Sequence, residues 1–164
     1  MDFLGLFHTA SGLAALSSGF GVVIQRKGTA RHRVLGWVYV GSMLALNATA
    51  LLLYRLTGGF NFFHAAALAS LGTLLLGMWP TRTRPFLGSS LFKHAYFMSG
   101  SYVGVLGATA AEIATRAFPS HFAAAAIASS GVALVAGIII VLRTVPKTAH
   151  RVERHPRVDM PHSN

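Results

Sequence analysis

Six ionisable side chains that could bind a cofactor lie near the ends of apolar stretches in this sequence. Five are histidines and one is a carboxylic acid: His8, His32, His64, His94, His121 and Glu112. Imidazole and carboxylate groups bind divalent metal ions, and a pair of imidazoles can bind haem iron on its two axial sides. An ionisable group inside an apolar segment needs a partner, so each of these side chains is a candidate functional residue.

The elements that must position these side chains are membrane-spanning helices. The chain has 164 residues, of which 53% are hydrophobic and 11% charged, whereas soluble domains carry about 25% charged residues. Apolar segments long enough to cross a hydrocarbon layer of about 30 Å cover about 3–25, 34–56, 60–80, 93–116 and 121–142. These segments lack the alternation of barrel strands, and helices satisfy their own backbone hydrogen bonds in lipid. We therefore predict an all-α integral membrane protein with five transmembrane helices.

The basic residues predict the orientation of this bundle. Twelve of the fourteen lysines and arginines lie in the regions that follow the first, third and fifth apolar segments, and the other side carries only Arg55 and Arg116. Because positively charged loops stay in the cytoplasm, we expect the N-terminus outside and the C-terminus inside. The net charge of +10 is then expected to face anionic lipid headgroups. Nucleic acid is not an expected partner, because the charges do not lie along one soluble face.

The chain is expected to have two parts. Residues 1–146 form the five-helix transmembrane domain, whose first apolar segment lacks a basic leader and a cleavage motif and is expected to remain uncleaved. Residues 147–164 combine charges, proline and histidine without apolar periodicity, which predicts a basic flexible cytoplasmic tail. The absence of cysteine excludes disulfides, thiolate catalysis and cysteine-bound zinc or iron–sulfur sites.

Short matches within the chain indicate an internal duplication. Phe7-His8 is echoed by Phe63-His64, and Tyr39-Val-Gly41 is echoed by Tyr102-Val-Gly104. The matching segments are expected to enter the membrane from the same side. This predicts a duplicated helical hairpin, as a parallel repeat, followed by an unpaired fifth helix.

The expected topology places His8, His64 and His121 near the outer ends of the odd-numbered helices, at the depth of Glu112. Three histidines, or two histidines and a carboxylate, could hold a divalent metal ion and leave a position open for water or dioxygen. Helix bundles bring together ligands from facing helices in this way. We therefore predict a metal site formed by His8, His64 and Glu112, with His121 as the fourth ligand. The alternative is that these histidines lie among lipid headgroups, which applies most strongly to His121 because it opens its helix.

The inner level of histidines consists of His32 and His94, at the cytoplasmic ends of the second and fourth segments. Two imidazoles from two helices could bind haem b, and two levels of histidine resemble the layout of two-haem membrane cytochromes of the b561 kind. Arg33 and Lys93 beside them are equally compatible with a lipid phosphate, a quinone headgroup or a simple membrane boundary. The predicted cofactor-binding residues of this level are His32, His94 and Arg33.

Glu112 lies deep in a mostly apolar segment. Ala108, Gly104 and Gly100 precede it at intervals of four residues and form a ridge of small residues on one helical face. Another helix could approach this ridge closely, and Glu112 would then face protein rather than lipid. The alternative is that Arg116, one turn further on, neutralises Glu112 near the membrane surface.

Several of these motifs resemble those of a known family. The elements are His8-x-x-x-Gly12, Lys27-Gly28, His32-Arg33-x-x-Gly36-x-x-Tyr39, Phe63-His64 and His94-x-x-x-Met98. Over residues 5–118 the chain resembles predicted bacterial inner-membrane proteins that carry domain of unknown function 2306. The resemblance implies a compact helical domain in the bacterial inner membrane, with histidines at the ends of its helices and no established reaction.

Three functions are compatible with these residues. The first is a polytopic membrane protein that binds a metal ion or haem through its histidines in a redox or respiratory setting. The second is a non-enzymatic accessory subunit or lipid-binding scaffold, whose ridge of small residues contacts another membrane protein or a second copy. The third is a small proton-coupled transporter with Glu112 as the proton carrier, although five helices leave little room for two gates.

Overall fold

The computed structural model describes residues 3–53, 58–82 and 89–154. The long helices are α1 (Phe3–Ile24), α2 (Ala30–Leu52), α3 (Phe62–Met78), α4 (Ser89–Ala117) and α5 (Phe122–Arg154). Two short 3-10 segments, η1 (Trp79–Arg82) and η2 (Pro119–His121), follow α3 and α4. These described residues contain no strand, so the all-α prediction is confirmed.

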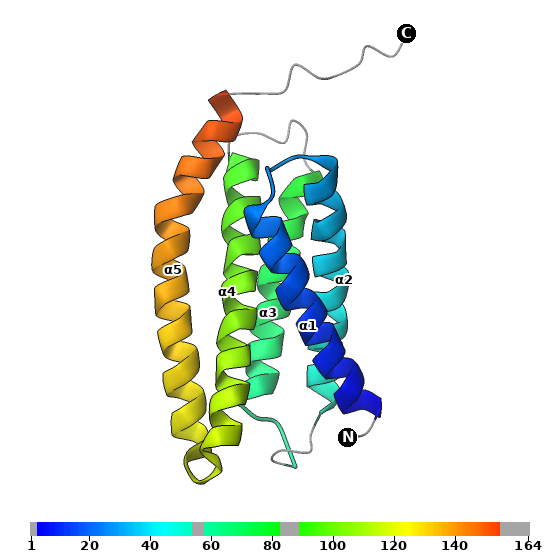
Figure 1. Ribbon diagram of the computed structural model, residues 1–164, viewed down its shortest axis with the longest axis vertical. Helices are drawn as coiled ribbons and strands as arrows, with labels where there is room; N and C mark the ends of the chain where they lie inside the picture. The colour runs from blue at the N-terminus through cyan, green and yellow to red at the C-terminus, as the bar shows by residue number, and fades with distance from the viewer. Residues whose placement is uncertain (1–2, 54–57, 83–88, 155–164) are drawn as a thin grey trace.

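The five helices run side by side and alternate in direction (Figure 1). α1 packs on α2, whereas α4 packs on both α3 and α5. As a result α2 and α4 begin at one end of the bundle, and α1, α3 and α5 begin at the other (Figure 1). We call the first the basic end and the second the opposite end. The alternation therefore separates the two levels of histidine as the sequence predicts.

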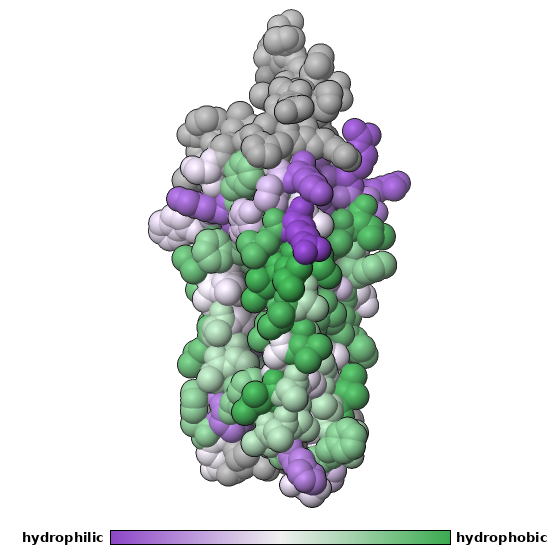
Figure 2. Space-filling model, turned by 90° about the vertical axis from the view of Figure 1, so that its left-hand side faces the viewer, coloured by the Kyte–Doolittle hydropathy of each residue, from purple (hydrophilic) through white to green (hydrophobic). Residues whose placement is uncertain are grey.

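Four helices have the length and composition of membrane spans: Phe3–Ile24, Ala30–Leu52, Phe62–Arg82 and Pro119–Lys147. In the view of Figure 2, hydrophobic side chains cover most of the length of the bundle and hydrophilic side chains gather toward the basic end. α4 is longer than three of these four candidate spans, but its composition is too polar for it to count as a span. It packs between α3 and α5. A helix flanked by other helices can carry polar side chains that lipid would disfavour. The protein is thus a multi-pass helical membrane protein.

The turn between α1 and α2 is built by three consecutive residues. Lys27 closes the end of α1, because its Nζ donates to the carbonyls of Val22 at 2.7 Å and Val23 at 2.9 Å. Gly28 has a φ of 76°, a conformation that other residues rarely adopt. Thr29 then caps α2 by accepting the backbone N–H of His32 at 3.0 Å. The Lys-Gly-Thr sequence therefore determines where α2 begins and where its first histidine lies.

The packed centre of the bundle consists of aliphatic and aromatic side chains from α1 to α4. Its buried members are Ala15, Tyr39, Val40, Met43, Leu74 and Val105. Tyr39 and Tyr102 meet edge to face with ring centroids 6.2 Å apart, and the Tyr39 hydroxyl lies 2.8 Å from Ser101 Oγ. The two tyrosines of the sequence matches are therefore in contact, although the internal repeat itself stays a prediction.

The tail prediction was wrong for its first residues, because α5 continues as a helix to Arg154. Residues 147–154 contain no glycine and include alanine, lysine and arginine, which favour helix. Pro146 lies inside α5, where its missing N–H removes one backbone hydrogen bond but does not end the helix. The rest of the predicted tail, 155–164, lies outside the described residues, as do Arg55 and Arg84.

No helix of the described chain packs closely on the ridge of small residues of α4, so its contact with another helix stays a prediction. A Cβ added at Gly100 or Gly104 would meet no atom within 4 Å. The close approaches of α4 use other positions: Gly137 of α5 lies against Val103, and Gly19 of α1 lies against Tyr102.

Candidate functional site

His32 on α2 and His94 on α4 lie at the basic end and interact electrostatically. Each residue is in the first two turns of its helix, and the two helices run in the same direction (Figure 1). The structure therefore places the two imidazoles of the predicted inner level at the same end of the bundle, near enough to interact electrostatically. That they bind a cofactor stays a prediction.

The ring of His94 is held by the end of α3. Its Nδ1 lies 2.8 Å from the carbonyl oxygen of Gly77. A carbonyl oxygen only accepts hydrogen bonds, so Nδ1 carries the proton and neutral His94 has its lone pair on Nε2. The carbonyls in the last turn of a helix lack partners within it, so His94 also caps α3. Met98, one turn further along α4, packs against the same glycine, which accounts for the spacing of His-x-x-x-Met.

One ring nitrogen of His32 is buried without a partner in the described chain. The backbone of Val22, near the end of α1, lies close enough to the ring to act on it electrostatically. Nδ1 is buried and has no hydrogen-bond partner within the part of the chain that the structure describes. Because about 90% or more of buried polar groups are hydrogen-bonded, this nitrogen needs an explanation.

The surroundings of His32 are basic and partly open. Lys27 acts on its ring electrostatically, and burial lowers the pKa of Lys27 from its ordinary value. Arg33 is exposed next to it. Gly36, one turn further along α2, has no atom within 4 Å of the place where a Cβ would lie. The His-Arg-x-x-Gly motif thus combines an imidazole, an exposed cation and an open space.

At the opposite end His8 is tied to α2 rather than to another histidine. Its Nδ1 lies 2.9 Å from Thr49 Oγ1. The single hydroxyl proton of Thr49 is directed to the carbonyls of Ala45 and Leu46, at 2.8 and 2.9 Å, so the hydroxyl accepts from His8. Glu112 acts on His8 electrostatically, but no hydrogen bond joins these two described residues. This imidazole therefore joins α1 to α2.

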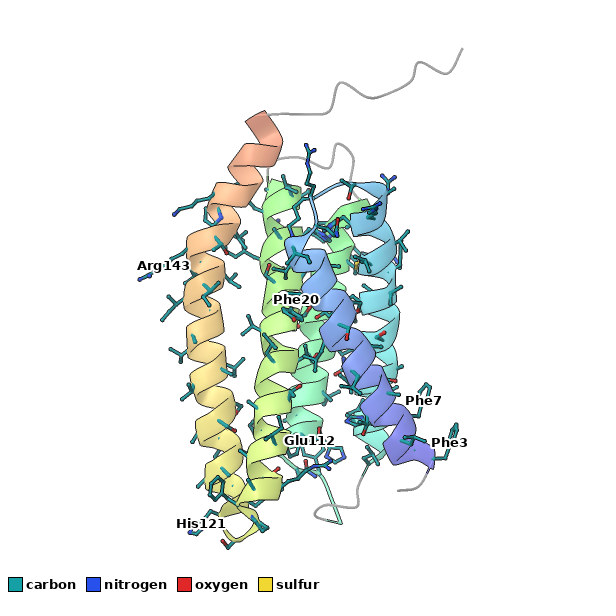
Figure 3. The ribbon with its side chains drawn as sticks, in the orientation of Figure 1. Phe3, Phe7, Phe20, Glu112, His121 and Arg143 are labelled. Carbon is teal, nitrogen blue, oxygen red and sulfur yellow. The ribbon has the colours of Figure 1, made fainter. Side chains whose placement is uncertain are left out.

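Glu112 forms an ion pair with Arg116, one turn along α4. Its side chain is 43% exposed and that of Arg116 is 64% exposed, so the pair lies at the surface of the bundle (Figure 3). No other helix of the described chain packs closely on the ridge that leads to Glu112, so the expectation that this side chain faces protein stays a prediction. This geometry favours the alternative in which Arg116 neutralises the carboxylate. It gives a proton-carrier role of Glu112 no support.

His64 and His121 have local partners of their own. The Nδ1 of His64 accepts the backbone N–H of Asn61 at 3.3 Å, and the Asn61 side chain accepts from Phe63, which makes a capping box at the start of α3. His121 is exposed at the turn into α5 (Figure 3), where its Nδ1 lies 3.0 Å from Ser120 Oγ. His64 therefore caps the start of α3, and His121 lies beside the start of α5.

The four predicted metal ligands do not gather into one site. Among residues 3–53, 58–82 and 89–154, no three His, Cys, Asp or Glu side chains could hold a metal ion together. The predicted set of His8, His64, Glu112 and His121 consequently has no support from this geometry. Equal depth in the membrane is not sufficient, since each of these side chains leaves its helix in a different direction.

Two variants separate a capping role of His64 from a ligand role. His64→Ala removes the acceptor of the Asn61 N–H, so we expect it to lower stability by about 1 kcal/mol, a usual cost of a lost cap. His64→Gln restores an acceptor that capping boxes commonly use, so we expect most of this loss to be recovered. Thermal unfolding of the purified protein measures both. Equal losses for the two variants would contradict the capping role.

Sequence reasoning missed Gly77, the partner of His94, and it predicted an interhelical hydrogen bond for Thr49 without identifying His8 as the partner. Gly77 is one of two glycines in α3, and nothing in the sequence distinguishes it from Gly72, whose side-chain position is open. The capping box at Asn61 and His64 had a readable signal, because the two residues lie three apart at the start of an apolar run.

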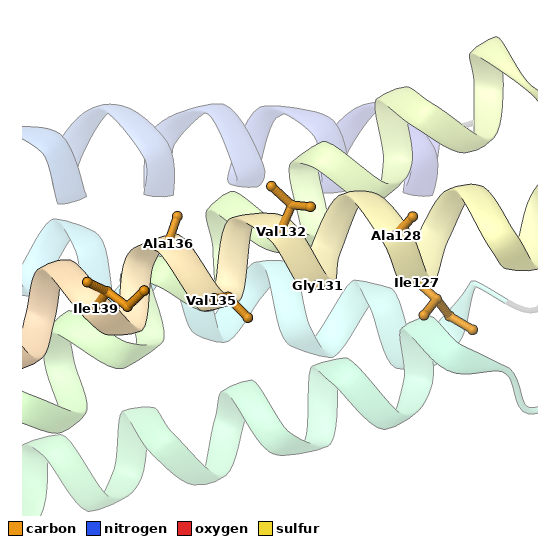
Figure 4. Close-up of a pocket in the computed structure, with 7 residues that line it drawn as sticks. All are labelled: Ile127, Ala128, Gly131, Val132, Val135, Ala136 and Ile139. Atoms are coloured by element: carbon orange, nitrogen blue, oxygen red, sulfur yellow. The ribbon is translucent and has the colours of Figure 1, made fainter.

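A shallow pocket on α5 offers no polar chemistry. Its lining comes from one helix, and every lining residue is apolar or glycine (Figure 4): Ile127, Ala128, Gly131, Val132, Val135, Ala136 and Ile139. This face of α5 is typical of a surface that contacts lipid chains.

The comparisons with known proteins agree with this description of the bundle. The sequence matches no curated protein and no solved structure. A family profile described as "Predicted membrane protein (DUF2306)" matches residues 5–145, a range that contains all six candidate side chains. The chain therefore belongs to the DUF2306 family of predicted membrane proteins.

Proposed function

We propose that this protein binds a transition-metal centre, and haem in particular, between His32 and His94 at the basic end of the bundle. The observation that carries the proposal is the buried Nδ1 of His32, which has no hydrogen-bond partner among the described residues. A metal centre would satisfy this nitrogen. His94 supports the proposal, because a ligand histidine commonly donates its other N–H to a backbone carbonyl, as His94 does to Gly77.

The number of ligands favours haem over a bare ion. One or two side chains from the protein are sufficient to hold a haem iron, whereas a bare zinc ion needs three or four. The basic end supplies two imidazoles, and the described chain contains no cluster of three His, Cys, Asp or Glu. The open space at Gly36 would admit part of a flat ring, and Arg33 would pair with its carboxylates. With both axial positions occupied, the haem would transfer electrons, which fits a redox or respiratory setting.

Absorption spectra and metal analysis of the purified full-length protein test this proposal. We expect a Soret band and one iron per chain, and we expect His32→Ala and His94→Ala each to remove most of both. His121→Ala is the matched control, because His121 is exposed and remote from the pair (Figure 3). Stoichiometric metal without a Soret band would favour a bare ion. A protein with neither, or a loss in the His121 variant alone, would refute the proposal.

We further propose that α4 is a fifth transmembrane helix, with the N-terminus outside and the C-terminus inside the bacterial inner membrane. The alternation of the helices supports it, because α4 runs the full length between α3 and α5 (Figure 1). The chain has no cysteine, so single cysteines can report on topology. In intact cells we expect a membrane-impermeant thiol reagent to label Ser120→Cys and not Ser89→Cys. Labelling of both, or of Ser89→Cys alone, would contradict this orientation.

A second candidate function is docking of another membrane protein on α4. The open positions at Gly100 and Gly104 favour it, because they leave a face of small residues that no described helix covers closely. We expect Gly104→Leu to displace a co-purifying partner without unfolding the protein. If every co-purifying protein remained bound to this variant, this function would lose its support.

A further inference from the structure

We infer that Gly77 is a positioning residue for the proposed centre. Its carbonyl fixes the tautomer of His94, and because glycine has no side chain, this carbonyl can reach the His94 ring. Nε2 of His94 is then the nitrogen that binds the metal. This inference rests on the proposed function. It assigns a role to a glycine that the histidine motifs do not contain.

The first step of the argument is the direction of one hydrogen bond. Nδ1 of His94 donates to the Gly77 carbonyl at 2.8 Å. While this bond holds, Nδ1 has no lone pair to offer a metal, and only Nε2 can be a ligand. The bond also fixes the plane of the ring, because it connects α4 to the last turn of α3.

The second step is the close approach of the two helices at this point. A Cβ on Gly77 would lie 2.8 Å from Met98 Sδ, 3.0 Å from its Cγ and 3.1 Å from its backbone nitrogen. The side chain of Met98 could move, but the backbone nitrogen could do so only if α3 and α4 separated. Such a separation would lengthen the bond between Gly77 and His94. Glycine at this position is therefore what keeps the carbonyl within reach.

The test is a titration of the full-length protein, purified without haem, with free haem. We expect Gly77→Ala to weaken haem binding by about 10–100-fold, the usual effect of losing a group that orients a metal ligand. Gly72→Ala is the matched control on the same helix, because its Cβ would meet no atom within 4 Å. Adding Met98→Ala to Gly77→Ala removes Cγ and Sδ from the contact, so we expect partial recovery of affinity.

A measurement on the unaltered protein makes the test independent of how the variants fold. Nitrogen NMR of histidine-labelled protein, with His94→Gln to assign the signal, is expected to show the Nδ1–H form of His94 before haem is added. The Nε2–H form would overturn the inference, and so would equal haem affinity in wild type and Gly77→Ala. A wild-type chain that binds no haem would instead refute the proposed function itself.

Discussion

Replacing Gly137 with alanine is expected to separate α5 from α4 and to lower stability by about 1–3 kcal/mol, the usual cost of overpacking. A Cβ at this position would lie 2.4 and 2.7 Å from the two Cγ atoms of Val103 and 3.0 Å from its Cβ. Valine is branched at Cβ and buried here, so it has little freedom to turn away. α5 packs on α4 and η2, so it has no other broad contact to compensate.

Denaturant unfolding of the purified protein in detergent measures this loss of stability. A second glycine of α5 provides a matched control for Gly137→Ala. Gly131→Ala lies on the same helix, and its Cβ would meet no atom within 4 Å. Alanine favours helix over glycine by about 1 kcal/mol, so the control is expected to be neutral or slightly more stable. Equal stability of the two variants would show that α5 does not contact α4 at Val103.

Gly19→Ala is expected to have a comparable effect on the contact of α1 with α4. Its Cβ would lie 2.4 Å from Cδ2 and 2.5 Å from Cε2 of Tyr102, and 3.1 Å from Cε2 of Tyr39. The Tyr102 ring is held on its far edge, because its hydroxyl donates to the Leu16 carbonyl at 3.3 Å. An added methyl group must therefore push α1 away or break this bond, at a cost of about 1–3 kcal/mol.

Gly12→Ala is the control on the same helix, since its Cβ would lie at an ordinary 3.5 Å from Leu46 of α2. Tyr102→Ala in the Gly19→Ala background removes the ring with which the added methyl group would clash. The two changes are expected to be non-additive, because the second change relieves the first. Strictly additive losses would show that Gly19 and Tyr102 are not in contact.

These two contacts matter for the proposed centre because α4 is the helix that the others share. α4 carries His94, and its position is set by Gly19 of α1, Gly77 of α3 and Gly137 of α5. The three close approaches lie within about two turns of α4, next to Tyr102, Met98 and Val103 respectively. Small residues allow helices in membranes to approach closely where lipid provides no hydrophobic driving force. A shift at any of these points would move His94 relative to His32.

The composition and the apolar segments of the chain were sufficient to establish a helical membrane protein with histidines at two levels. The reason is that the depth of a residue in a spanning helix follows directly from its position in the sequence, at about 1.5 Å per residue. His32 and His94 could be placed at one end in this way, and His8, His64 and His121 at the other. The start of α3 was readable too, since Asn61 and His64 interact within one helical turn.

Which of these side chains meet was decided only by the packing of the helices. The direction in which a side chain leaves its helix depends on how that helix is rotated and crossed against its neighbours, and this follows from contacts between residues far apart in the chain. His32 and His94 interact electrostatically at the basic end, where the Gly77 carbonyl of α3 holds the ring of His94. The outer set did not meet, because His8 bonds to Thr49 and Glu112 pairs with Arg116 on the exposed side of α4.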